Sequence, residues 1–147
     1  MEKNCSTNIS TTSNDSRAAG YAASGDIDRI LSHIALRDTL APENSPVLSP
    51  DRKEEIRTIA RAATYIFTSK FPDLFPRPII ADEPKTAPGL PAETSEFILT
   101  MLSEFVASYT LTTIYASVDR PYSEHHRARA ADCVETLRVL EVPISLL

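Results

Sequence analysis

The residues whose types and positions could do chemistry in this chain are Ser49, the pair His125 and His126, and Cys133. Ser49 precedes a proline and is followed by Asp51 and Arg52, the order of a proline-directed kinase site. A phosphate there would lie at a helix N-terminus, where backbone amides and the helix dipole favour negative charge. The same Ser-Pro order is also an ordinary helix start. Ser49 is therefore a candidate phosphorylation site with a purely structural alternative.

His125 and His126 follow Glu124 and suggest a metal site. Ligands on one helix converge only when they lie three or four residues apart. Residues 128–130 are Ala, Arg and Ala, so this spacing is not met, and we expect a solvated helix start with no metal. Cys133 falls in an apolar stripe, where a buried thiol is usually inert, so we expect it to serve packing.

Glycine-rich phosphate loops, G-x-S-x-G, H-E-x-x-H and paired cysteines do not occur in the sequence. We therefore predict no catalytic residue, no cofactor and no metal. An active site could still assemble from scattered Glu, His and Arg residues. The question of an enzyme stays open, with the balance toward a non-catalytic protein.

The stretch 97–118 dominates the sequence, because Glu104 is the one charge in its 22 residues. Its length would allow a membrane span. Glu104 at mid-span would cost about 2.5 to 3.5 kcal/mol, and hydroxyl side chains fall on every face. We therefore expect a buried helix of a globular domain or an obligate interface, and no membrane span.

Helical patterns and stop signals place the other elements around this stretch. We predict an all-α fold of about four helices, over residues 26–40, 50–70, 91–118 and 122–141, in a single domain 26–147. Residues 1–25 are rich in Ser, Thr and Asn, so we expect a disordered polar tail. Residues 71–91 hold six of the 11 prolines, which predicts an extended connection that either packs on the helices or docks elsewhere.

The formal net charge of −5 argues against direct binding to nucleic acid. The two cysteines, Cys5 and Cys133, provide neither a disulfide framework nor a metal-ligand spacing. A reducing, intracellular compartment is the simpler expectation.

Residues 93–140 resemble the second half of a histone fold, with a long median helix, a basic loop and a final helix that opens with Asp. Residues 93–106 are similar to the start of the median helix, and residues 125–138 (HHRARAADCVETLR) are similar to the loop and the final helix. The chain departs from the family at His125 and in the greater length of 108–124. The resemblance implies a nuclear subunit that pairs through its long helix with a second histone-fold chain.

Taken together, these patterns predict a non-catalytic interaction subunit that pairs, as a homo- or hetero-oligomer, through the long apolar helix. Phe97, Met101, Phe105 and Tyr109 recur every four residues and form the predicted partner face. Such a protein, purified alone, should self-associate or retain a partner. The alternative is a translocated bacterial effector, for which the polar tail would serve delivery, or a small helical enzyme.

Overall fold

The structure is a computed structural model and describes residues 27–46, 50–76 and 84–145. Within these ranges there is no strand. The elements are α2 (Ile27–Leu40), the 3-10 helix η2 (Pro42–Asn44), α3 (Pro50–Ser69), α4 (Ala92–Tyr115) and α5 (Arg120–Ser145). The prediction of an all-α fold of four helices is confirmed. Ser49, the tail 1–25, Ile79 and Ile80 lie outside the described residues.

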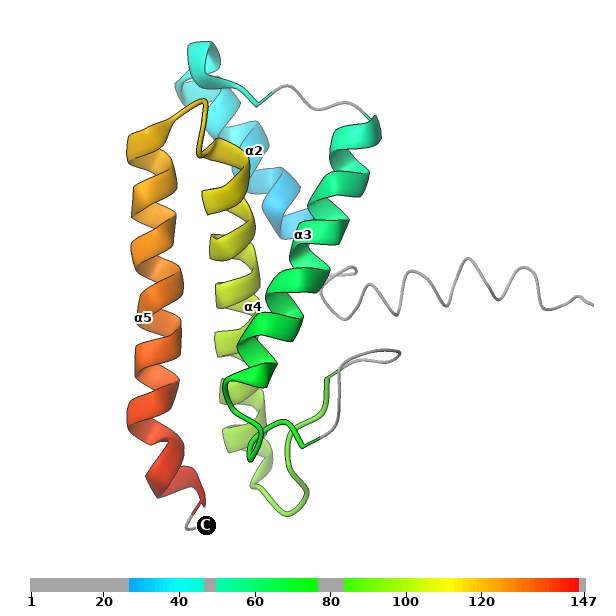
Figure 1. The fold of residues 1–147 in the computed structure, drawn as a ribbon, viewed down its shortest axis with the longest axis vertical. Helices are drawn as coiled ribbons and strands as arrows, with labels where there is room; N and C mark the ends of the chain where they lie inside the picture. Colours follow the sequence, from blue (N-terminus) through cyan, green and yellow to red (C-terminus); the bar gives the residue numbers. More distant parts are fainter. Residues whose placement is uncertain (1–26, 47–49, 77–83, 146–147) are drawn as a thin grey trace, which may run out of the picture.

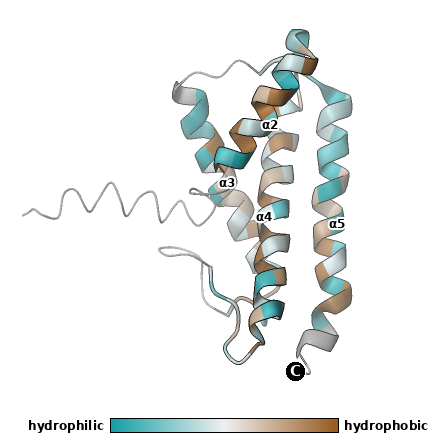
Figure 2. Ribbon diagram, turned by 180° about the vertical axis from the view of Figure 1, so that it is seen from behind, coloured by the Kyte–Doolittle hydropathy of each residue, from teal (hydrophilic) through white to brown (hydrophobic). Residues whose placement is uncertain are grey.

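Helix α4 is the centre of the fold (Figure 1). Helices α3 and α5 lie along its two sides and do not pack extensively against one another. Helix α2 covers the upper part of the back face of α4, and it lies in front of α4 when the molecule is seen from behind (Figure 2). Among the described residues, α4 is the one helix long and apolar enough to cross a membrane. Half of its most apolar window is buried by these neighbours.

The core forms because apolar positions three and four residues apart on each helix point toward α4. Phe67 of α3 is fully buried at its centre, with its ring centroid 4.9 Å from Phe105 and 5.2 Å from Phe71. Leu74 and Phe75 are buried as well. The start of the proline-rich connection therefore packs on the helices, one of the two alternatives that its sequence left open.

Helix boundaries follow local signals with three differences, the first being that α5 begins at Arg120, two residues before the predicted start at 122. Asp119 begins α5 as its N-cap, because its Oδ1 accepts a hydrogen bond from the Tyr122 amide at 3.3 Å. Helix α4 ends at Tyr115, three residues before the predicted Val118, where the chain turns. The predicted end of the last helix at residue 141, just before Pro143, was wrong, since α5 continues to Ser145. A proline so close to the helix end removes one backbone hydrogen bond and leaves little helix beyond it.

Candidate binding groove

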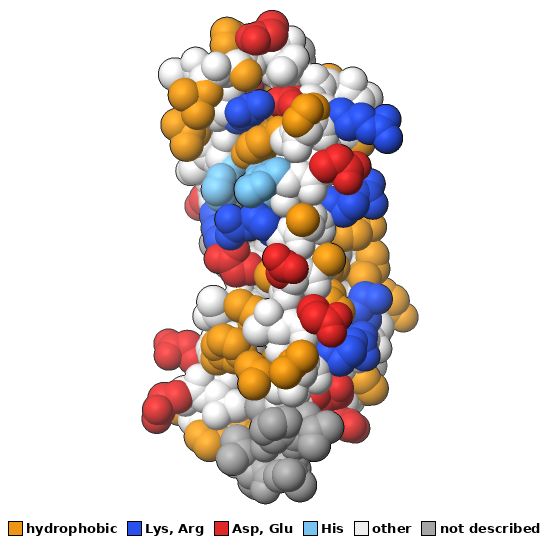
Figure 3. All heavy atoms as spheres, turned by 90° about the vertical axis from the view of Figure 1, so that its left-hand side faces the viewer, with side chains coloured by type: hydrophobic (Ala, Val, Ile, Leu, Met, Phe, Trp, Pro, Cys, Tyr) orange, Lys and Arg blue, Asp and Glu red, His pale blue; other side chains and the backbone are white. Residues whose placement is uncertain are grey.

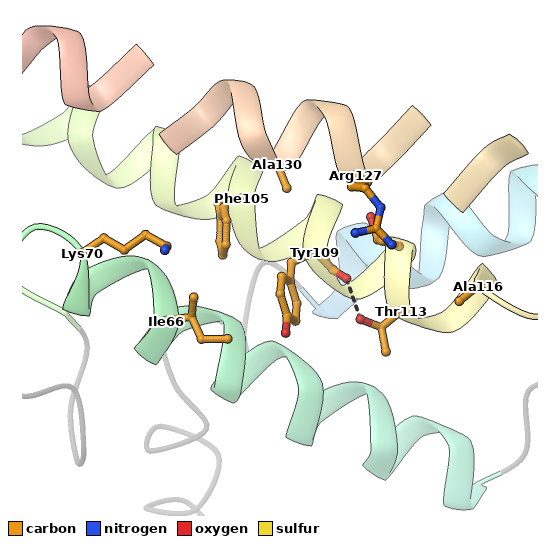
Figure 4. A pocket seen from close by; sticks show the side chains of 9 residues that line it. Ile66, Lys70, Phe105, Tyr109, Thr113, Ala116, Arg127 and Ala130 are labelled. Carbon is orange, nitrogen blue, oxygen red and sulfur yellow. Dashed lines mark hydrogen bonds between the residues drawn. The ribbon is translucent and has the colours of Figure 1, made fainter. Parts of the chain in front are cut away.

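A groove runs over α4 between α3 and α5, on the face away from α2. It encloses about 520 Å³, within the usual range for ligand sites. Its floor on α4 extends from Phe105 to Ala116, which is about 16 Å at 1.5 Å per residue, or three helical turns. The groove is thus elongated along α4 (Figure 4).

The lining combines apolar, hydroxyl-bearing and cationic side chains, and no carboxylate is among them. Its members are Ile66, Phe105, Ala116 and Ala130, then Tyr109, Thr112 and Thr113, then Lys70 and Arg127. The hydroxyls of Thr112 and Thr113 donate to backbone carbonyls one turn earlier, Ser108 O at 2.8 Å and Tyr109 O at 3.0 Å. Because these two hydroxyls already donate within the helix, the threonines contribute to the floor through their methyl groups as well. The floor is therefore mainly apolar.

Lys70 and Arg127 supply the charge of the groove from opposite sides. Lys70 extends from α3 beside Phe105, and Arg127 extends from α5 above Thr113 (Figure 4). Both residues are exposed, and Lys70 forms no ion pair with any described residue. Arg127 pairs with Glu124 at 3.3 Å, with both side chains at least half exposed. An exposed pair of this kind contributes about 0–1 kcal/mol, so Arg127 can exchange Glu124 for another carboxylate.

The predicted partner face of Phe97, Met101, Phe105 and Tyr109 divides into two parts. Phe105 and Tyr109 stack at 5.6 Å and line the groove, although Phe105 is itself buried against Phe67 of α3. Met101 is half-buried and Phe97 is 38% exposed, and neither lines the groove. The structure thus brings two of the four predicted residues to the groove.

The cations of the groove were missed by the sequence reasoning. Lys70 follows the last turn of α3, and Arg127 occupies an exposed position among other arginines of α5. Their only sequence signal is a basic residue beside an apolar stripe on two different helices. That signal is common on helical surfaces, so it did not single them out.

A polar cluster on the side of α4 away from the groove joins α2 to the start of α5. Arg37 of α2 donates two hydrogen bonds to Asp119 Oδ2, at 2.6 Å and 3.1 Å. Its guanidinium also lies 4.6 Å from the ring centroid of Tyr122. Burial would raise the pKa of Asp119, but the hydrogen bonds from Arg37 and the Tyr122 amide hold the pKa below its usual value. This cluster attaches α2 to the α4–α5 turn.

His126, one of the two predicted metal-ligand candidates, lies inside this cluster. It is 6% exposed, and its ring centroid lies 4.6 Å from Tyr122 and 6.1 Å from His33. Its Nδ1 is buried and has no hydrogen-bond partner among the described residues. Burial, followed by repulsion from His125, His33 and Arg129, lowers the pKa of His126 to about 4. His126 is therefore neutral at neutral pH.

Metal ligation and thiol chemistry find little support in the described part of the chain. No group of three or more His, Cys, Asp or Glu side chains there could hold a metal ion. Burial raises the pKa of Cys133 to about 11, so its sulfur stays protonated and unreactive at neutral pH. His125 is exposed on α5. Histidine side chains, pale blue, reach the surface beside Lys or Arg side chains, blue, on the face shown in Figure 3.

Glu104, the one charge of the predicted central stretch, connects three helices. Its carboxylate accepts hydrogen bonds from Arg29 of α2 at 2.5 Å and from Arg129 of α5 at 3.2 Å. Burial works against ionisation, but these two arginines lower the pKa of Glu104. The charge that argued against a membrane span thus serves to hold α2 and α5 on α4.

The described part of the chain is all-helical, with an open groove along its central helix. Comparison with protein-family models, with curated proteins and with solved structures finds no match.

Proposed function

We propose that this protein is a non-catalytic interaction subunit that receives a helix of a partner protein in the groove over α4. The observation that carries the proposal is the gap left between α3 and α5, in which Tyr109, Thr112 and Thr113 of α4 stay partly or fully exposed. A partner helix laid there would extend the helical packing around α4. This is the helix-in-groove mode, in which side chains at i, i+4 and i+7 serve as anchors.

The dimensions support a helix as the occupant. The floor rises about 16 Å from Phe105 to Ala116, so it matches three turns of a partner lying along it. Tyr109 offers aromatic surface at one end, beside the buried Phe105 and Ala130, and Ala116 offers a shallower floor at the other end (Figure 4). Side chains of unequal size on the partner would fill these two ends, which provides register.

A histone-fold-like version of this proposal places the protein in a nuclear assembly and pairs α4 with a second chain of that family. It rests on the sequence pattern of residues 93–140. Residues 125–138, similar to the family's loop and last helix, all lie within the single helix α5. The histone-fold version stays a prediction, and the groove does not depend on it.

The test is to fill the groove without disturbing the fold. Thr113 is exposed, lines the groove, and its hydroxyl donates to the carbonyl four residues earlier. Thr100 on the same helix is also exposed and makes the same kind of hydrogen bond to Glu96 O at 2.8 Å, but it does not line the groove. Thr113→Trp should therefore block a partner helix, and Thr100→Trp is its matched control.

Full-length protein carrying either substitution would be used as bait in a lysate of its native host, followed by mass spectrometry and affinity measurement on the partners recovered. We expect Thr113→Trp to weaken partner binding by at least about tenfold, equivalent to about 1.4 kcal/mol, with Thr100→Trp unchanged. Partners that bind both variants as tightly as the wild type would overturn the proposal.

A further inference from the structure

The charges of the groove lining restrict the class of partner more than the shape of the groove does. Every charged side chain in the lining is cationic, and the two cations come from different helices. Because the chain as a whole carries a net charge of −5, this local excess of positive charge runs against the rest of the molecule. Charge complementarity therefore selects an anionic occupant.

The positions of the two cations favour a peptide over a ligand with one acidic head. Lys70 lies at the Phe105 end, and Arg127 lies farther along, above Thr113 (Figure 4). A fatty acid carries one carboxylate and can pair with only one of these two cations. A helix presents side chains along its whole length, so it can place one carboxylate near each cation while its apolar face meets the floor.

We infer that the groove binds an acidic amphipathic helix of a partner protein. Its apolar residues at i, i+4 and i+7 contact Ile66, Tyr109 and Ala116, lining residues that are not fully buried. Asp or Glu residues on the two flanks of that apolar stripe pair with Lys70 and Arg127, and the second carboxylate displaces Glu124. This inference rests on the proposed function, because it names the chemistry of the helix that the same groove receives.

Specificity and attraction have different origins in this arrangement. The apolar floor would accept many amphipathic helices, since its contacts lack direction. Carboxylates at the two cation positions restrict the choice, because a basic helix would place like charges against Lys70 and Arg127. Both cations are exposed, so the charge contribution is screened by salt and acts mainly on the association rate.

A displayed library of helical peptides with randomised surface positions provides the test. It would be selected on the full-length wild-type protein, and binders that also bind Thr113→Trp would be removed. We expect the groove-dependent sequences to carry an apolar i, i+4, i+7 stripe flanked by Asp or Glu. The affinity of the best peptides should fall about tenfold between 50 and 500 mM salt.

Charge reversal sharpens the result. In Lys70→Glu/Arg127→Glu, selected acidic peptides should lose at least tenfold in affinity, and the same peptides with Lys in place of Glu should gain at least tenfold. The milder Lys70→Gln/Arg127→Gln should lose the preference without reversing it. The matched control Lys53→Glu/Arg61→Glu changes the net charge equally at exposed positions outside the lining and should behave as the wild type. Circular dichroism would verify that each variant folds.

The outcomes separate the two proposals. Groove-dependent peptides without an acidic bias, or an affinity that charge reversal leaves unchanged, would overturn the acidic helix and leave the groove function standing. A selection that yields no groove-dependent helix would overturn both. Self-association that Thr113→Trp abolishes would assign the groove to a second copy of this chain, and saturable, Thr113→Trp-sensitive binding of dodecanoate in place of peptides would assign it to an amphiphile. Either result would contradict the inference.

Discussion

His126 is the residue whose burial has the clearest consequence for the molecule. It is neutral, and its ring packs edge-to-face with the rings of Tyr122 and His33. Charged groups facing it include Arg129 of its own helix and His33 of α2, and both disfavour a proton on its ring. Leaving Nδ1 buried without a partner costs about 1 to 3 kcal/mol. The polar cluster thus joins helices although Nδ1 of His126 and the Tyr115 hydroxyl are both buried in it without a hydrogen-bond partner among the described residues.

The pKa of His126 predicts a loss of stability in acid. Above pH 6.5 the ring is neutral in both states and contributes nothing. As the pH falls from 6.5 toward 4, His126 becomes protonated in the unfolded chain but stays neutral in the folded protein. The free energy of unfolding therefore declines by up to about 3 kcal/mol. His126→Phe keeps an aromatic ring and removes the titration. Denaturant unfolding from pH 7 to pH 4 should therefore show a shallower decline for the variant.

The neighbouring position provides the control for that measurement. His125 is exposed, so His125→Phe should keep most of the acid-dependent decline of the wild type. Parallel decline in the wild type and in His126→Phe would show that other groups, such as Glu104 and Asp119, account for the acid response.

At the scale of elements, the turn between α4 and α5 holds α2 in place. Asp119 uses one carboxylate oxygen to cap α5 and the other to bind Arg37 of α2. The Ser123 hydroxyl donates to Thr112 O at 2.7 Å, which ties the first turn of α5 to α4. A side chain that starts one helix thus also positions another, and this arrangement keeps α2 on the face opposite to the groove.

Two substitutions at Asp119 separate its two roles. Asparagine is an equally good N-cap, so Asp119→Asn should remove the ion pair and keep the cap, with a lower free energy of unfolding than the wild type. Asp119→Ala should lose roughly 1 kcal/mol more, because the cap is gone as well. Urea denaturation measures both values. Equal destabilisation by the two variants would show that the cap contributes nothing to stability.

At the scale of the whole molecule, the described core draws on residues from Ile27 to Leu137. The groove residues also lie within this span, from Ile66 to Ala130. Residues 1–25 lie outside the described residues, and their Ser-, Thr- and Asn-rich sequence offers little apolar surface for either a core or an apolar groove. Folding and partner binding are thus expected to belong to the helical domain alone.

Deletion of residues 1–25 should therefore leave the thermal unfolding midpoint and the affinity for groove-dependent partners unchanged. Calorimetry and titration with a selected peptide would measure the two quantities, with Thr113→Trp as the non-binding reference. For the translocated effector, the same deletion would instead abolish delivery from the producing cell. Loss of groove binding on deletion would contradict the assignment of binding to the helical domain.

The sequence by itself determined the helices and the core position of α4. Apolar spacing and Pro50 are local signals, and a helix responds to signals within a few residues. The exception was Pro143, whose effect depends on how much helix follows it. The scarcity of charge in residues 97–118 likewise identified the helix that the others must cover.

Only the tertiary structure decided which parts of α4 stay open and which charges meet there. Arg37 and Asp119 are 82 residues apart in sequence, and Lys70 and Arg127 belong to different flanks of the groove. Their proximity depends on how the helices cross, which is set by side-chain packing over the whole core. For the same reason Phe105, predicted as partner surface from its spacing, is largely covered by Phe67. Local periodicity predicts an apolar face but cannot say which neighbour buries it.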